Sequence, residues 1–251
     1  MQRFPYSCEF TLRGTGDIKT TLMNLYLLSF SGAFKGESGE SCNNNYSLDS
    51  ACPICGTGAE LAENLVAKGL SGVKADFFQT FDTDYLISER LYLFMKNQGI
   101  KVEYLTRVLN VKGKDTIFFH LASHIILPKA SDKTTGLTTE RQCPVCKRNG
   151  YFNETIHEET PNGIKRVYPP IKLVYENVED VLFSFSDVFH TWECTGWSNL
   201  KSEGFKAVRY ARPMLIVSER IKNVFEKFGV KKSVFEEVTI LDNAPVLRNM
   251  Q

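Results

Sequence analysis

The chain has 251 residues, of which 43% are hydrophobic, and its formal net charge is +1. This length permits one large domain or two small ones, with a real hydrophobic core. A net charge near zero is not typical of a general nucleic-acid binder, which concentrates positive charge on one face. A local basic patch is still compatible with this net charge.

The first residues differ from those that follow. Residues 1–22 hold Gly14 and Gly16, scattered charges and no sustained hydrophobic period, so we interpret them as an N-terminal extension. From Met23 the chain becomes apolar, and residues 24–28 predict a buried β-strand. The apolar run that ends at Phe30 is shorter than the roughly 20 residues that span a bilayer, and no cleavage site of a secretory signal follows it. We therefore expect no membrane association.

Three polar segments divide the rest of the chain. Residues 35–50 are rich in Gly, Ser and Asn and predict a loop, and residues 129–142 are polar and Thr-rich and predict a linker. Residues 160–163 predict a hairpin turn between strands at 151–159 and 164–168. The expected organisation is an extension (1–22), a first α+β half (23–128), the linker (129–142) and a second α+β half (143–251).

An internal repeat suggests that the two halves are related. The sequence LISERL at residues 86–91 recurs as IVSERI at residues 216–221. In each copy a serine, Ser88 or Ser218, can cap a helix, and a glycine, Gly99 or Gly229, fits the left-handed position after it. A strand is expected after each helix, at 101–108 and at 233–241. Helix capping explains the Ser-Glu-Arg sequence more simply than a repeated active site does.

The predicted helices share one apolar face. Its residues recur at helical spacing. They are Leu91, Phe94 and Met95 in the first copy and Ile221, Val224 and Phe225 in the second.

Two Cys-Pro-x-Cys segments are the strongest chemical signal. They supply Cys52 and Cys55 in the first half and Cys143 and Cys146 in the second. Two residues between cysteines let both thiolates of a tight turn face one ion, and four thiolates complete the tetrahedral shell of a structural zinc ion. Because the pairs are far apart in the chain, we predict a Zn²⁺ ion that joins the two strand–helix–strand halves of an α+β fold.

Two alternatives to zinc are a redox dithiol and unliganded buried cysteines. A redox site needs only one CxxC pair, usually at a helix start, so two proline-containing pairs favour metal. The other cysteines, Cys8, Cys42 and Cys194, have no partner at ligand spacing and are expected to be structural. Seven cysteines, an odd number with four in CxxC pairs, also fit a cytoplasmic protein better than a secreted disulfide framework.

Signals for an enzyme are incomplete. His120 and His124 have the spacing of a metalloprotease helix, but the glutamate base is missing between them and the preceding residues predict a strand. His157 and His190 are isolated, and the glycines near residue 15 lack the strand and third glycine of a phosphate loop. We expect no catalytic residues and no enzyme activity.

The cysteine frame resembles a known family, the double-CxxCG immunity proteins of bacterial polymorphic-toxin systems. The similarity covers about residues 23–241 and includes CPICG at 52–56, CPVC at 143–146, DVF at 187–189, LIVSERI at 215–221 and FEEV at 235–238. Lys147 stands where the family has its second glycine.

The resemblance implies a protein that binds a cognate toxin and neutralises it by covering the active site. The alternative is a zinc-ribbon-like protein that binds nucleic acid or acts in transcription. That role needs Lys147, Arg148, Lys165 and Arg166 to form one basic patch with exposed aromatic side chains such as Tyr151 and Tyr168. We interpret these charges as solvated hairpin surface, which makes a nucleic-acid partner the weaker hypothesis.

Overall fold

The computed structural model describes residues 24–161, 163–176, 178, 186–198 and 211–241. The predicted extension 1–22 and Cys8 lie outside these residues. The described part is rich in β-strands and contains two helices, which agrees with the expected α+β class. None of its helices has the length and apolar character needed to cross a membrane.

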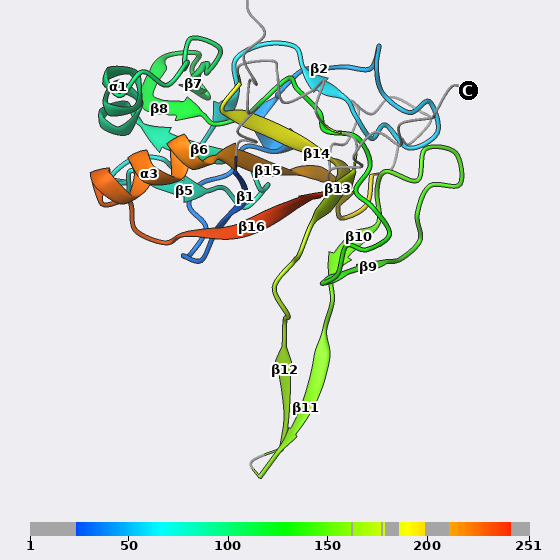
Figure 1. Ribbon diagram of the computed structural model, residues 1–251. Helices are drawn as coiled ribbons and strands as arrows, with labels where there is room; N and C mark the ends of the chain where they lie inside the picture. Colours follow the sequence, from blue (N-terminus) through cyan, green and yellow to red (C-terminus); the bar gives the residue numbers. More distant parts are fainter. Residues whose placement is uncertain (1–23, 162, 177, 179–185, 199–210, 242–251) are drawn as a thin grey trace, which may run out of the picture.

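The larger sheet has seven strands in the order β13-β16-β1-β15-β14-β10-β9 (Figure 1). Its strands are β1 (Leu25–Phe30), β9 (Leu137–Thr139), β10 (Tyr151–Asn153), β13 (Val174–Glu176), β14 (Val188–Thr195), β15 (Arg212–Ser218) and β16 (Ser233–Leu241). The predicted strands at 24–28 and 233–241 are both confirmed. The segment expected as a linker contains β9, which pairs with β10.

β1 lies in the middle of this sheet, antiparallel to both β15 and β16. Its side chains alternate between two hydrophobic cores, as the period of a strand requires. Leu25 and Leu27 belong to one core, and Leu28 belongs to the other with Tyr26 and Phe30 packed against it. β1 is therefore buried on both faces, among strands of the C-terminal segment.

The smaller sheet has five strands in the order β4-β7-β8-β6-β5. Its strands are β4 (Val66–Ala67), β5 (Phe77–Gln79), β6 (Tyr85–Ser88), β7 (Arg107–Asn110) and β8 (Asp115–His120). Two strands, β2 (Tyr46–Ser47) and β3 (Glu60–Leu61), form a ribbon near the 3-10 helix Glu40–Cys42. The prediction of a strand from residue 101 is wrong, because Val102 and Leu105 form a turn with both side chains in the core, and β7 begins only at Arg107.

The two helices, α1 (Glu89–Asn97) and α3 (Glu219–Phe228), begin where the sequence predicts. The hydroxyls of Ser88 and Ser218 accept hydrogen bonds from the backbone N–H groups of Leu91 and Ile221, which satisfies free donors at each helix start. Gly99 and Gly229 have φ of +76° and +80°, the left-handed conformation expected after a helix.

α1 packs on the smaller sheet, α3 packs on the larger one, and the helices contact each other (Figure 1). Leu91, Met95, Ile221, Val224 and Phe225 are buried in one common core, and Phe94 packs against its edge. The rings of Phe94 and Phe228 lie 5.1 Å apart. The two helices that begin with the Ser-Glu-Arg sequence thus face each other across one core. That residues 23–128 and 143–251 arose from one duplication stays a prediction.

The predicted hairpin around residues 160–163 is confirmed. β11 (Ile156–Thr160) and β12 (Gly163–Val167) form a separate two-stranded ribbon that projects from the body of the molecule (Figure 1). The expected strand at 151–159 is divided, because β10 stays in the larger sheet and β11 leaves it.

Candidate metal centre

Both Cys-Pro-x-Cys segments fold into the same tight turn. In the first, the N–H of Gly56 donates to the carbonyl of Cys52 at 2.8 Å, and in the second the N–H of Lys147 donates to the carbonyl of Cys143 at 3.0 Å. Gly56 and Lys147 have φ of +74° and +55°, so each turn closes with a left-handed residue. This geometry turns both sulfurs of each pair toward the same side.

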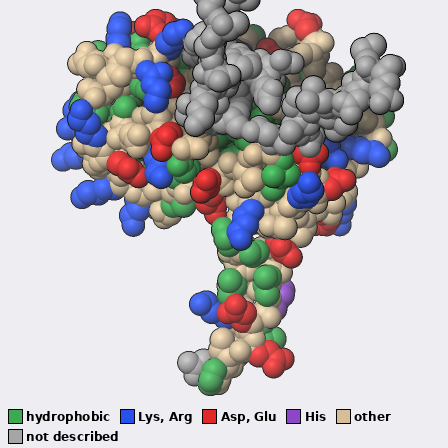
Figure 2. All heavy atoms as spheres, in the orientation of Figure 1, with side chains coloured by type: hydrophobic (Ala, Val, Ile, Leu, Met, Phe, Trp, Pro, Cys, Tyr) green, Lys and Arg blue, Asp and Glu red, His purple; other side chains and the backbone are tan. Residues whose placement is uncertain are grey.

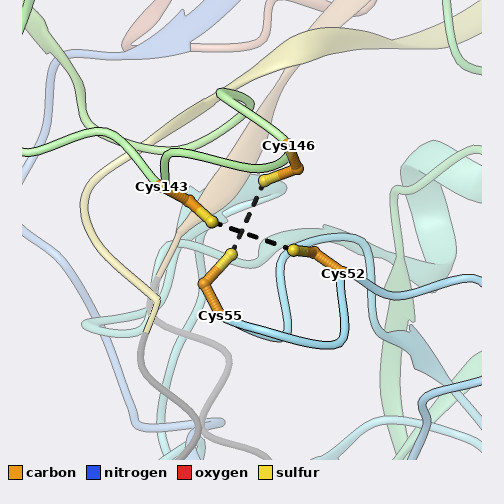
Figure 3. Close-up of side chains that lie close together, drawn as sticks. All are labelled: Cys52, Cys55, Cys143 and Cys146. Atoms are coloured by element: carbon orange, nitrogen blue, oxygen red, sulfur yellow. Dashed lines mark hydrogen bonds between the residues drawn. The ribbon is translucent and has the colours of Figure 1, made fainter.

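The structure brings all four predicted ligand cysteines together (Figure 3). The sulfurs of Cys52 and Cys143 are 3.8 Å apart, those of Cys55 and Cys146 are 3.6 Å apart, and all four lie within 4.8 Å of one another. With zinc–sulfur bonds of about 2.3 Å, sulfurs at the corners of a tetrahedron are ~3.8 Å apart. Each of these two close pairs has one sulfur from the first turn and one from the second. The cluster can therefore hold a metal ion between two segments that are distant in sequence.

Electrostatics disfavour four ionised thiols without a cation. Burial raises the pKa of the Cys55 thiol, and burial together with the neighbouring Cys55 sulfur raises that of Cys146 to about 12. Burial acts in the same direction at Cys52, but the backbone N–H groups of Cys55 and Ile54 stabilise its thiolate and lower its pKa to about 7. The first thiolate therefore forms readily and further ones repel each other, a cost that a bound divalent cation offsets.

The second turn is anchored to the larger sheet. The buried Asn149 side chain accepts a hydrogen bond from the N–H of Cys143 at 2.8 Å. The carbonyl of Arg148 accepts one from the N–H of Cys194 in β14 at 2.6 Å, and the Arg148 guanidinium donates to the carbonyl of Trp192. These contacts fix the position of Cys143 and Cys146 relative to β14.

Arg148 also extends toward the first turn. A Cβ atom at Gly58 would lie 2.9 Å from the guanidinium of Arg148, so glycine permits this close approach. This cation beside the turns can offset part of the negative charge of a thiolate cluster, whereas the Lys147 side chain is exposed to solvent.

We expect Lys147→Gly to raise the free energy of unfolding by about 0.5–1 kcal/mol. A lysine in the left-handed region is strained, and glycine removes this strain at some cost in unfolded-chain entropy. Chemical denaturation of the metal-loaded protein measures the change. The control Lys74→Gly replaces an exposed lysine whose φ is not positive and should be slightly destabilising. Equal effects of the two substitutions would contradict the assignment of strain to Lys147.

The remaining cysteines and histidines do not form a second metal site among the described residues. Cys42 and Cys194 are buried and outside the cluster. His120 ends strand β8 and His124 follows in a loop, so the two do not share a helix face as a metalloprotease site requires. His157 lies on the projecting ribbon, and His190 lies on β14.

A cavity of about 120 Å³ at the seam between the sheets is lined in part by His120, His124, His190 and Arg148. Behind it, His120 Nε2 and Arg212 Nε lie 3.6 Å and 3.8 Å from Asp84 Oδ1, and all three residues are buried. This charge network connects the two sheets. The sequence alone does not reveal this network, because no local pattern links Asp84 to Arg212.

The chain matches no protein-family model, and it matches no curated protein sequence either. The fold and the site define a sheet-rich α+β protein with four cysteines placed to hold a metal ion. What it does in the cell has to be inferred from its own residues.

Proposed function

We propose that the four cysteines bind one Zn²⁺ ion whose role is structural. The donor set supports zinc, because four thiolates fill a tetrahedral shell and leave no open position for a substrate. The location supports a structural role, since the ion would tie the turn at residues 52–55 to the turn at 143–146 beside β14. The zinc would stabilise the fold and take no part in a reaction.

We infer that the whole protein is an immunity protein that binds and neutralises a cognate toxin by occlusion. The observation that carries this proposal is the meeting of the two Cys-Pro-x-Cys turns, since the family resemblance rests on that frame. An exposed protruding element, the β11–β12 ribbon, is what a protein that binds a partner can use for contact. Partner recognition, without turnover, is the function that we propose.

The nucleic-acid alternative receives less support from the charges. Arg148 is half-buried against the ring of Trp192, with its guanidinium 5.9 Å from the ring centroid. Lys165 and Arg166 lie on the separate ribbon, directly opposite Glu158 and His157. Glu158 therefore places a negative charge beside Lys165, where a phosphate-binding surface would need positive charge alone.

Co-expression with the polypeptide encoded by the adjacent reading frame tests the function. We expect that polypeptide to arrest growth alone, and this protein to restore growth and form a stoichiometric complex with it. Because His124 has no role in this proposal, His124→Ala should protect as well as the unchanged chain. Growth arrest that persists together with the absence of a complex in a pull-down would reject the immunity function.

A further inference from the structure

The ribbon of β11 and β12 contributes nothing to the cores of the protein. Its strands pair only with each other, and every side chain from Ile156 to Thr160 and from Gly163 to Val167 is exposed or half-exposed. An isolated two-stranded hairpin is at best marginally stable in water. A projection of this kind gains stability when a partner covers it, which makes it a candidate interaction element.

The side chains of the ribbon have the composition of a binding surface. Ile164 near the turn is 72% exposed, and Ile156 and Tyr168 at the base are also exposed. The salt bridges found among the described residues all lie in the body of the molecule, so the charged side chains of the ribbon are available to a partner. Figure 2 shows apolar side chains along the ribbon and acidic ones gathered toward its end.

The size of the ribbon restricts the shape of the partner. Strands of five residues are about 17 Å long, and a two-stranded ribbon is roughly 10 Å wide and 10 Å thick. One face laid on a flat surface would bury only ~170 Å², whereas a ribbon enclosed on all sides would bury ~700–800 Å². A specific interface buries about 800 Å² on each partner, so the ribbon by itself provides this area only where a cleft surrounds it.

We propose that the β11–β12 ribbon is the toxin-binding arm of this protein and that it enters the active-site cleft of the toxin. This inference rests on the proposed immunity function. The cross-strand pair nearest the turn, apart from Thr160 and Gly163, is Glu159 with Ile164, and these two residues would reach deepest. The floor of the cleft should therefore offer an apolar pocket for Ile164 and a cationic group for Glu159.

The charges further from the turn indicate how the walls of the cleft are arranged. Glu158 lies opposite Lys165, and His157 lies opposite Arg166, closer to the body. Toward its end the ribbon thus carries a carboxylate, Glu159, with no cation opposite it, and toward the body it carries a cation, Arg166, with no carboxylate opposite it. A basic floor with acidic groups at the rim is complementary to this arrangement and suits an enzyme that binds an anionic substrate.

Two variants test the arm. In the first, an Asn-Gly turn replaces residues 157–166, which is feasible because the flanking residues Ile156 and Val167 lie directly opposite each other at the base. In the second, Ile164→Asp places a charge at the deepest position. Ile117→Asp is the matched control, since Ile117 is an exposed strand residue of the body, on β8.

The probe is the polypeptide encoded by the adjacent reading frame, in growth protection and in titration with the purified proteins. We expect both arm variants to keep the metal content and the thermal midpoint of the unchanged chain. The shortened variant should lose protection, and Ile164→Asp should weaken binding by about 30-fold or more, as a central anchor does. Ile117→Asp should bind within about threefold of the unchanged chain.

The outcomes separate the arm from the function. If the unchanged chain protects and the shortened variant protects equally, the arm is rejected and the immunity function stands. If the unchanged chain neither protects nor binds, the proposed function fails and the arm fails with it. If the unchanged chain is a dimer in light scattering and Ile164→Asp is a monomer, the ribbon binds a second copy of this chain and the cleft proposal is overturned.

Discussion

Replacement of Cys143 by serine is expected to release the metal and to lower the thermal midpoint by about 10 °C or more. Three remaining thiolates leave the tetrahedral shell open, and for a structural site the binding free energy of zinc is also folding free energy. Each lost kcal/mol lowers the midpoint of a chain of this size by about 2–4 °C. Metal analysis of protein purified without chelator, together with calorimetry, measures both effects.

Cys42→Ser is the matched control. Cys42 is at least as buried as the cluster cysteines, but its sulfur contacts no other sulfur: it donates to the carbonyl of Glu37 at 3.2 Å and lies 4.0 Å from the Ser41 hydroxyl. This variant should keep one zinc per chain and a midpoint within a few degrees of the unchanged protein. A strong chelator should reproduce the Cys143→Ser midpoint in the unchanged chain. Full metal content in Cys143→Ser, with an unaltered midpoint, would remove the structural zinc from the proposal.

The cysteine cluster was predictable because its chemistry is local. Cysteine, proline and two-residue spacing already specify a turn that presents two sulfurs, and the pairing of two such turns follows from the coordination number of zinc. From the sequence, Arg148 was recognisable only as a cation. Its hydrogen bond to the Trp192 carbonyl and its close approach to Gly58 depend on segments that the fold brings together.

The helices and several strands were predictable for the same reason. Capping serines and a 3.6-residue apolar period define α1 and α3, and alternation or an apolar run defines β1 and β16. The pairing of the strands was not predictable, because the backbone N–H and C=O groups of a strand can bond to any neighbouring strand. The placement of β1 between β15 and β16, rather than beside the strands of its own segment, is such a case.

The residues that bind the repeated Ser-Glu-Arg motif were not predictable from the sequence either. Ser88 and Arg90 both bind Asp76, and Ser218 and Arg220 both bind Asp187. In each copy the backbone N–H of the serine also donates to the carbonyl of the same aspartate, at 2.9 Å. The motif therefore fixes a helix start to a preceding segment through an aspartate. The separation of aspartate and serine differs between the copies, so the repeat did not reveal it.

The two aspartates differ in burial, and this difference leads to a prediction. The Asp187 side chain is 2% exposed, whereas that of Asp76 is 21% exposed. We expect Asp187→Ala to lower the free energy of unfolding by about 2–4 kcal/mol and Asp76→Ala by about 1 kcal/mol. Removal of Asp187 leaves the buried hydroxyl of Ser218 without its carboxylate partner and Arg220 without its ion pair, while water can replace the carboxylate of Asp76.

Denaturant unfolding of both variants, with the metal bound, measures these values. The double variant Asp187→Ala/Ser218→Ala should lose less than the sum of the single losses, because the two side chains share a hydrogen bond of 2.6 Å. Strictly additive losses, or an Asp76→Ala variant less stable than Asp187→Ala, would contradict the burial argument. The predicted order makes the Asp187 contact the stronger of the two equivalent anchors. It holds the start of α3 against the beginning of β14, where Val188 and Phe189 lie in the two different cores.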